Sequence, residues 1–408
     1  MRKMCVMLAL LACLADCGVT RPAGGTEPAA TEPSGGEWGV LGAESVTPVP
    51  MQTQTQAPEE TPEPKPASLA EICPEKVTVW LDGVAVEGLA RDGAALVEAG
   101  QWTDRWSWFR GDGDGKTWSF TGEWTDEQAK PPEISCVEAE RFSGVECVYY
   151  SGDEEEYWIP AEWVALRFGY QYLEDPEQQA VYVTPYVDTQ EIPTGVSVPV
   201  LMYHAVSDDL WGIEELFVSP DDMRAQLEYL TENGYDPIFF SDLSHLSDYD
   251  KPVILTLDDG YDDNYTELFP LLQEYDVKAT VFVITGFLGT EHYMTADQAR
   301  EMSESGLVDI QSHTVHHPEL EELDYDAQKD EISQSRLEVA RVTGRIPYVL
   351  AYPSGSRNDD TLSIMPDYYA LGVDMNGGTW VTGESWYKVD RIYISRMDTL
   401  DDFAAKLS

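Results

Sequence analysis

The second half of the chain is predicted to form an α/β fold in which parallel strands alternate with helices. Short apolar runs rich in β-branched residues recur between segments that have helical periodicity and clear helix-end signals. Ionisable residues follow directly after two of these runs, at Asp258-Asp259 and at His313 to His317. Functional groups gather where parallel strands end, so both clusters fall where a site is expected. Periodicity alone leaves open whether the sheet is a barrel or an open sheet.

The elements of this half can be justified in chain order. Ser219 and Pro220 predict a helix start, because serine caps a helix and proline suits its first position, and Gly234 ends that helix. Thr295 and Gln298 form a capping box that starts a later helix. The expected elements are a helix at 219–234, a strand at 253–257, a helix after 260, a strand at 277–284, a helix at 295–306, a strand at 308–310, a helix at 325–343 and a strand at 347–352.

Asp259, His313 and His317 offer the ligand set of a divalent metal site. Carboxylate and imidazole groups suit zinc and similar ions, and a catalytic site typically keeps one position open for water. Two histidines four residues apart share one face of a helical turn, so we expect His313 and His317 to reach one ion while His316 points elsewhere. Asp258 is then the candidate base that takes a proton from the attacking water.

Each motif also has an interpretation in which it is not functional. An Asp-Asp-Gly sequence after an apolar run is typical of a solvated turn or a helix cap, and a histidine cluster can be a surface feature. The combination favours a site, because three of the chain's six histidines fall within five residues at a strand end. The H-E-x-x-H protease signature is absent, since Thr314 occupies the position of the glutamate base.

Four motifs, in family order and spacing, resemble the polysaccharide deacetylases, carbohydrate esterase family 4. The resemblance covers about residues 196 to 405, within an expected domain of 196–408, and implies a distorted, incomplete (β/α) barrel. The motifs are Val198-Pro199-Val200-Leu201-Met202-Tyr203-His204 as the opening strand, Thr256-Leu257-Asp258-Asp259-Gly260, Ser312-His313-Thr314-Val315-His316-His317-Pro318, and Ala351-Tyr352-Pro353-Ser354-Gly355.

What the resemblance implies is hydrolysis of N-acetyl groups on an amino-sugar polymer, such as poly-N-acetylglucosamine, a chitin-like glycan or peptidoglycan. The implied cofactor is a divalent metal, zinc first, with cobalt, manganese and nickel as alternatives. The roles it assigns are base for Asp258, metal ligands for Asp259, His313 and His317, and contacts to substrate or oxyanion for Ser354 and Tyr352, with the backbone N–H near Ser354 helping to hold the oxyanion.

The chain departs from the family pattern in two places. Many members have an arginine in the third motif that orients the catalytic aspartate, and this chain has Ala351 there; Arg391, in a strand that resembles the R-I-x-[VI] strand of the A-Y-P-x-G subgroup, is expected to supply the charge. The late L-x-H motif, whose histidine is the general acid, has no counterpart, because no histidine follows His317. His204 is the remaining candidate acid, with a buried structural role as the other reading.

The N-terminus predicts export. Residues 1–17 combine a basic head with an apolar stretch too short to span a membrane, as in a secretion signal. The sequence before Cys13 resembles a bacterial lipobox and that before Cys17 is the alternative, so either would carry a lipid; an ordinary cleaved signal is the other reading. Residues 18–72, rich in Pro, Thr and Glu, predict a disordered tether. The expected location is the outer face of a bacterial membrane.

Residues 73–188 are expected to form a small α+β domain. Alternating apolar residues from Val77 to Leu81 lead into Asp82-Gly83, which is a hairpin signal. Residues 157–170, followed by Val181-Tyr182-Val183, resemble the repeat of the copper amine oxidase N-terminal-like domain. The resemblance implies no copper, because the segment has no histidine. Core packing is the favoured role of its tryptophans over stacking on sugars. These are Trp102, Trp106, Trp108, Trp118 and Trp124.

The cysteines of this domain suggest one bridge. Cys136 and Cys147 bracket an expected hairpin and would form a disulfide in an oxidising exterior, which leaves Cys73 without a partner.

The net charge of the chain excludes one kind of partner, and the motifs leave two classes of function. The net charge of −50, from 75 acids and 25 bases, excludes nucleic acid as a partner. The first class is a metal-dependent deacetylase at the cell surface, which meets the membrane only through its lipid. The second is a surface glycan-binding lipoprotein that keeps the metal but lacks turnover, as the absent histidine and displaced arginine allow.

Overall fold

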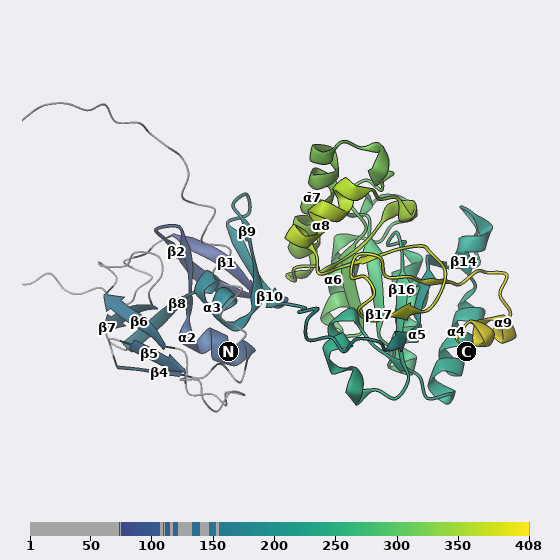
Figure 1. Cartoon of the computed structure of the whole chain (residues 1–408). Coiled ribbons are helices and arrows are strands. Elements are labelled where there is room, and N and C mark those ends of the chain that lie inside the picture. The colour runs from purple at the N-terminus through teal and green to yellow at the C-terminus, as the bar shows by residue number, and fades with distance from the viewer. Residues whose placement is uncertain are drawn as a thin grey trace, which may run out of the picture. The chain divides into compact units, whose positions relative to one another are not determined.

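The computed structural model describes residues 73, 75–106, 109, 111–114, 117–120, 133–138, 147–151 and 155–407. These residues belong to one compact unit, Glu63–Ser408. Two sheets organise it, one from residues 76–185 and one from residues 200–393 (Figure 1). The predictions for the signal sequence, the lipid-bearing Cys13 or Cys17, the tether, Trp108 and Trp124 lie outside the described residues.

The first region is an α+β module, as expected. Among the residues described, strands β1 to β10 form one mixed sheet in the order β4-β5-β6-β7-β8-β3-β2-β1-β10-β9. Its elements are β1 (Lys76–Leu81), β2 (Val84–Arg91), β3 (Ala94–Glu98), α2 (Ala99–Arg105), β4 (Gly111–Gly113), β5 (Thr117–Phe120), β6 (Glu133–Glu138), β7 (Cys147–Ser151), β8 (Glu155–Pro160), α3 (Ala161–Phe168), β9 (Tyr170–Asp175) and β10 (Ala180–Pro185).

Two predictions for this module are confirmed. Strands β1 and β2 are antiparallel, with Leu81 opposite Val84, so they form the expected hairpin around Asp82-Gly83. Trp102, Trp106 and Trp118 are buried in the core of the module. Burial of these rings removes them as a platform for sugars, because a stacking platform needs an exposed ring face.

The predicted hairpin between Cys136 and Cys147 is wrong. Strands β6 and β7 run parallel, with Cys136 directly opposite Cys147, whereas a hairpin needs antiparallel strands. A hydrogen bond between the two thiols lowers the pKa of Cys136. Both cysteines are reduced in this structure, and the disulfide stays a prediction.

The second region is a curled parallel sheet, which confirms the predicted distorted barrel. Its order is β20-β19-β18-β17-β16-β12-β22, with β15 pairing β16, and all these pairs are parallel. The strands are β12 (Val200–Tyr203), β15 (Asp236–Pro237), β16 (Pro252–Leu257), β17 (Ala279–Val283), β18 (Val308–Ser312), β19 (Val349–Ala351), β20 (Leu371–Val373) and β22 (Ile392–Tyr393). Short pairs join β11 (Ser197–Val198) to β21 (Trp380–Val381) and β13 (Ala205–Val206) to β14 (Phe217–Val218).

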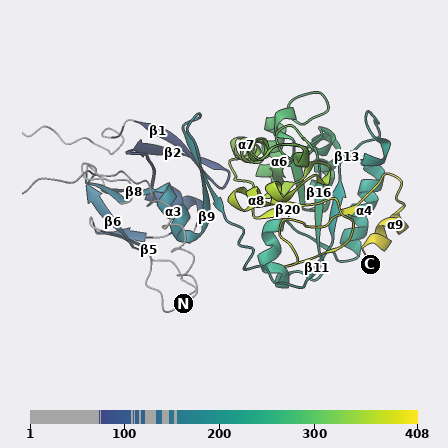
Figure 2. The ribbon, with the colours of Figure 1, turned by 45° about the horizontal axis from the view of Figure 1, so that its top comes forward.

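Helices cover the outer face of this sheet. Figure 2 shows β16 and β20 among helices α4, α6, α7 and α8. The helices are α4 (Pro220–Glu232), α5 (Phe269–Tyr275), α6 (Ala296–Glu304), α7 (Tyr325–Thr343), α8 (Asp359–Tyr368) and α9 (Leu400–Lys406). Shorter turns are η2 (Glu214–Leu216), η3 (Phe240–Asp248), η4 (Asn264–Leu268), η5 (Thr285–Phe287), η6 (Leu320–Glu322) and η7 (Pro353–Gly355). None of the helices in the described ranges has the length and apolarity that a bilayer span requires.

The helix-end signals act as the sequence predicts. The Ser219 hydroxyl accepts the Asp222 amide at 3.0 Å, with Pro220 in the first helical turn of α4. Thr295 and Gln298 make the reciprocal bonds of a capping box at the start of α6. Helix α4 ends just before Gly234, whose φ of 69° is the left-handed conformation that glycine adopts without strain.

The sheet is buried on both faces. In β17, Val281 and Val283 pack in the cluster that includes the helices, whereas Phe282 lies between them in sequence and packs in a different cluster. Parallel strands buried on both faces are nearly continuous apolar runs, as this one is. The polar residues at the strand ends are therefore mounted on a close-packed scaffold.

Candidate metal centre and catalytic site

Strand β16 delivers the two aspartates to one end of the sheet. Its residues are paired with β12 and β17 on either side, up to Leu257. The chain then turns sharply, with φ values of 75° at both Asp259 and Gly260. A positive φ is costly for a residue other than glycine, so Asp259 is in a conformation that its surroundings must hold. Asp258 and Asp259 are both buried.

The histidine segment is not the helical turn that its spacing suggests. It follows β18 as irregular backbone, with left-handed φ values of 64° at Thr314 and 57° at His317. The helical prediction is wrong because spacing of four residues gives one face only when the backbone is helical. The reversal nevertheless turns His313 and His317 toward each other, with ring centroids 4.8 Å apart. His316 does point elsewhere, and its Nδ1 lies 2.7 Å from Glu331 Oε1.

Three ligand atoms converge where the two segments meet. Asp259 Oδ1 lies 3.5 Å from His313 Nε2 and 3.7 Å from His317 Nε2. Ligand atoms of these three residues all lie within 4.8 Å of one another. One carboxylate and two imidazoles are a donor set for zinc and other borderline divalent ions, and three protein ligands leave positions for water and substrate. The residues therefore fit a divalent ion.

The protonation state of the histidines suits this role. His313 Nδ1 lies 2.8 Å from the Ala351 carbonyl oxygen, so Nδ1 carries the proton and Nε2 is left as a ligand. Burial lowers the pKa of His317, and the neighbouring His313 lowers it further. A neutral imidazole is the form that binds a metal. His317 is also the partly exposed member of the set, with 31% of its side chain accessible, so the site is open on that side.

Asp258 is fixed by a buried arginine. Arg391 is fully buried, and its two terminal nitrogens each lie 2.7 Å from one oxygen of Asp258. Burial raises the pKa of Asp258, but the Arg391 guanidinium outweighs burial and holds that pKa well below its usual range. The carboxylate is thus ionised and held in one orientation by a two-point contact. Arg391 directly precedes β22, and β12 lies between β22 and β16 in the sheet.

Arg391 is itself held in place. Its Nε donates to the Asp374 carbonyl oxygen at 2.9 Å and one terminal nitrogen donates to Thr256 Oγ1 at 3.1 Å. The buried Asp374 carboxylate pairs with Arg357 and accepts an amide hydrogen from Asn376 at 2.6 Å. Sequence analysis missed Asp374, although it follows the apolar run of β20 just as Asp258 follows β16. That shared pattern was the available signal.

His204 lies close to the base. It follows β12, is buried, and is near enough to Asp258 that its charged form lowers the pKa of that carboxyl. Its Nδ1 has no hydrogen-bond partner among the residues described. Its carbonyl oxygen accepts the Asn264 side-chain amide at 2.9 Å, and the adjacent Asp263 carboxylate accepts the Val206 amide at 2.9 Å. Neither Asp263 nor Asn264 was identified from sequence.

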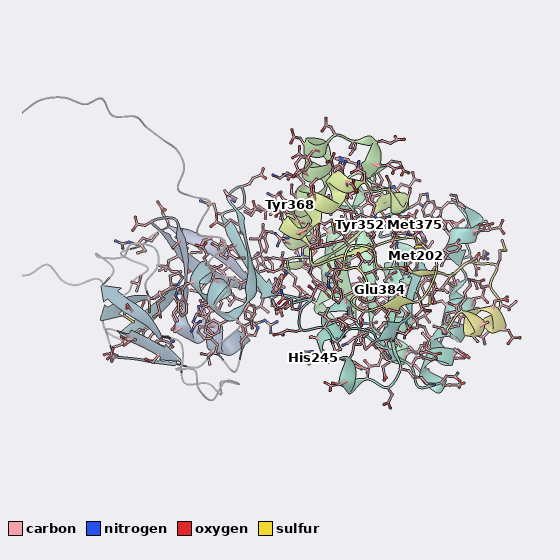
Figure 3. The ribbon with its side chains drawn as sticks, viewed as in Figure 1. Met202, His245, Tyr352, Tyr368, Met375 and Glu384 are labelled. Carbon is pink, nitrogen blue, oxygen red and sulfur yellow. The ribbon has the colours of Figure 1, made fainter. Side chains whose placement is uncertain are left out.

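The expected contact of Tyr352 with the substrate or oxyanion needs correction, whereas the expectation for Ser354 is compatible with its place in the structure. Tyr352 is fully buried; its hydroxyl donates to the Tyr387 carbonyl at 3.0 Å and its amide donates to the Val373 carbonyl at 3.2 Å. Both groups are already bonded, so neither is available to a substrate oxyanion. Ser354 is exposed, with a φ of 53°, in the turn η7 that follows the Ala351 carbonyl. Figure 3 labels Tyr352, which directly precedes η7, and Met375, which follows β20 and lies next to Gly355 of η7.

Glu331 is a further residue that sequence analysis missed. It lies on α7, and its Oε2 accepts the backbone amides of Val315 and His316, each at 2.9 Å. No sequence motif contains it, and a glutamate on a helix is usually a solvated surface residue. Only the packing of α7 against the end of β18 makes it part of the site.

Comparison with known proteins agrees with this geometry. Residues 246–370 match the family model described as "Polysaccharide deacetylase". YxkH of Bacillus subtilis (strain 168), named as a polysaccharide deacetylase, is 30% identical over 230 residues, which cover 54% of this chain and 81% of that protein.

A second relative and a solved structure are also similar to part of the chain. The poly-beta-1,6-N-acetyl-D-glucosamine N-deacetylase of Escherichia coli (strain K12) is 30% identical over 134 residues, 28% of this chain and 20% of that protein. The structure of the Streptococcus pyogenes deacetylase PplD in complex with acetate is 31% identical and has a TM-score of 0.50. It covers 53% of this chain and all of that chain. The fold that this structure shares with the chain is the curled parallel sheet.

Proposed function

The chain belongs to the polysaccharide deacetylase family, and from that premise we propose that it removes N-acetyl groups from an amino-sugar polysaccharide at the cell surface. Family membership makes it an enzyme that hydrolyses amide bonds. The observation that carries the proposal is the convergence of Asp259, His313 and His317 beside an ionised, arginine-bound Asp258.

The proposed reaction divides its work among these residues. Asp259, His313 and His317 would hold a divalent ion, zinc first, which supplies Lewis acidity toward the acetamide carbonyl and toward water. Asp258, kept ionised by Arg391, accepts the proton of the attacking water at a carboxylate oxygen. Ser354, exposed beside the site, presents its backbone to the acetyl oxygen as the carbonyl becomes tetrahedral.

His204 is proposed as the acid that protonates the leaving amine. Two observations support this assignment: its place near Asp258, and its Nδ1, which has no hydrogen-bond partner within the described part of the chain. A substrate with a leaving group that needs no proton tests it. We expect His204→Ala to lower acetate release from an amino-sugar amide by about 10²-fold or more, yet to spare hydrolysis of 4-nitrophenyl acetate. Equal losses on both substrates would show that His204 is structural.

The proposed substrate is poly-N-acetylglucosamine or a similar amino-sugar polymer. The activity in the name of the Escherichia coli relative supports this choice, although that likeness covers only a fifth of the relative. A glycan panel tests it: purified full-length protein, with zinc added, is incubated with N-acetylglucosamine oligomers, chitin fragments and peptidoglycan, and free acetate is measured. Release from one class and not the others identifies the polymer. No release from any of them would favour the glycan-binding alternative.

The proposed location is the outer face of a bacterial membrane, through a lipid on Cys13 or Cys17. The short apolar stretch, the lipobox-like sequences and the Pro-rich segment that follows support it. Radiolabelled palmitate should enter the protein in its native host and be lost when both cysteines are changed to serine. Absence of label from the unaltered protein would dismiss the anchor.

A further inference from the structure

We propose that Glu331 is the positioning residue that holds the histidine loop, residues 313–317, in the shape that binds metal. The inference rests on the proposed metal site and extends it to a residue that is not one of the three metal ligands. Glu331 is on α7 and reaches the loop from its outer side.

The loop needs an external support because its backbone is strained. Thr314 and His317 both have left-handed φ values, 64° and 57°, and neither is glycine. Such conformations persist only where the surrounding structure holds them. Close to the loop, the His317 amide donates to Thr314 Oγ1 at 3.1 Å and the Thr314 amide to Ser312 Oγ at 3.3 Å. From η5, the Thr285 and Gly286 amides donate to the carbonyl oxygens of Thr314 and Val315 at 3.1 and 2.9 Å.

Glu331 holds the backbone amides at the middle of the loop. Its Oε2 accepts the amides of Val315 and His316, both at 2.9 Å, and its Oε1 lies 2.7 Å from His316 Nδ1. The carboxylate is mostly buried, with 15% of the side chain accessible, whereas 68% of the His316 side chain is accessible. The two backbone contacts therefore lie in the better protected part of the interaction.

The same face of α7 also holds the start of the loop. Ser335, one helical turn after Glu331, is fully buried and lies 2.8 Å from Ser312 Oγ. Glu331 and Ser335 thus fix both the middle and the beginning of a segment whose two ends carry His313 and His317. Partners that orient metal ligands from outside the site typically change metal affinity about 10- to 100-fold when removed.

Substitutions of Glu331 can separate the effect of its negative charge from the effect of its side-chain length. Gln keeps an oxygen at the same reach, and one oxygen already accepts both amides, so Glu331→Gln should preserve the loop. Asp keeps the charge but is one methylene shorter, so Glu331→Asp should release the amides. If Glu331 acted instead through its negative charge near the metal, Glu331→Gln would be the variant with the larger loss of zinc affinity and Glu331→Asp would be close to the unaltered protein.

The experiment uses the full chain and two readouts. Zinc affinity is measured by competition with a chromophoric chelator, and hydrogen exchange of the Val315 and His316 amides is measured in metal-free protein. We expect Glu331→Asp to weaken zinc binding about 10- to 100-fold and to speed exchange at both amides, with Glu331→Gln close to the unaltered protein. Asp330→Ala, which removes an exposed acid next to it on α7, is the matched control and should change neither.

Two results would overturn the inference. One is a Glu331→Asp variant with unchanged zinc affinity and unchanged amide exchange; the other is Glu331→Gln with the larger loss. The exchange readout needs no metal, so it separates this inference from the proposed function. Unaltered protein that binds no zinc would reject the metal site, whereas amide exchange would still decide whether Glu331 holds the loop.

Discussion

Asp258 carries its function through a contact that no local sequence pattern contains. The carboxylate is buried, and alone it would resist ionisation; Arg391, 133 residues later in the chain, keeps it charged and oriented. The expectation that Arg391 replaces the arginine absent from the third motif came from family resemblance. The structure supplies the distances, because a two-point contact between strands depends on side-chain packing and not on spacing.

Arg391→Gln should therefore damage the protein as well as its activity. Removing one partner leaves the Asp258 carboxylate buried without a counter-charge, which costs about 3–5 kcal/mol of unfolding free energy. Urea unfolding measures the stability and acetate release measures turnover. Arg391→Lys keeps the charge and loses the two-point contact. Its stability and turnover should therefore lie between those of the native protein and those of Arg391→Gln. An unchanged Gln variant in both measurements would remove Arg391 from the account.

Asp263 gives a prediction for pH. Burial raises the pKa of Asp263 to about 6, against the partial opposing effect of the Val206 amide and the Asn264 side chain. The unfolded carboxyl has a pKa near 3.9, so between about pH 4 and pH 6 the folded state binds more protons and stability falls as pH rises. From about pH 5 to about pH 7.5 this group should cost the native protein roughly 1 kcal/mol relative to Asp263→Asn.

Urea unfolding of both proteins at the two pH values checks this sign. The Asn side chain keeps an acceptor for the Val206 amide and cannot titrate in this range. The variant should therefore gain stability over the native protein as pH rises. A difference that stays constant with pH, or that moves the other way, would show that Asp263 titrates normally.

At the scale of elements, strands and helix ends were predictable and the loops between them were not. The strand at 253–257 and the capping box at Thr295 rest on local chemistry, which acts in the same way in any fold. The helical turn expected at His313 to His317 failed because that shape depends on bonds from α7. The hairpin at Cys136 failed similarly, since strand direction depends on the whole sheet.

Gly260 tests the turn that follows β16. Its φ is 75°, and a Cβ there would lie 2.8 Å from Val283 Cγ1 and 3.2 Å from Val283 Cα. Gly260→Ala should cost more than about 1–2 kcal/mol, because a clash adds to the conformational cost. It should also weaken zinc binding, since Asp259 is the preceding residue. Thermal unfolding and chelator competition measure the two effects.

Gly289 provides the matched control for that substitution. Its φ is 78°, but a Cβ there would meet no atom within 4 Å. Gly289→Ala should therefore show the conformational cost alone and leave zinc affinity unchanged. Equal losses for the two variants would mean that the contact with Val283 does not matter.

At the scale of the whole molecule, the sequence predicts the fold class and the family more securely than it predicts the roles of single residues. Ordered motifs at strand ends identified the deacetylase half, and family comparison confirms it. Residues from other elements that support those motifs, such as Asp374 and Glu331, depend on tertiary packing. The likeness of the preceding module to the copper amine oxidase N-terminal-like domain stays a prediction.

Metal removal should lower the stability of the whole chain. A ligand that binds only the folded state stabilises it by about 2.7 kcal/mol when present at 100 times its dissociation constant. Thermal unfolding with zinc and with a chelator measures this difference. Asp259→Asn should abolish most of it, because one of the three ligands loses its charge. Equal unfolding temperatures with zinc and with chelator would contradict a metal site.

The most direct test of the central claim is acetate release by the zinc-loaded full chain compared with its Asp258→Asn variant. The claim is that Asp259, His313 and His317 hold the metal while Asp258 moves the proton. We predict that Asp258→Asn binds zinc as the native protein does and releases acetate from N-acetylglucosamine oligomers at least about 10²-fold more slowly. An Asn variant with native turnover would contradict the claim.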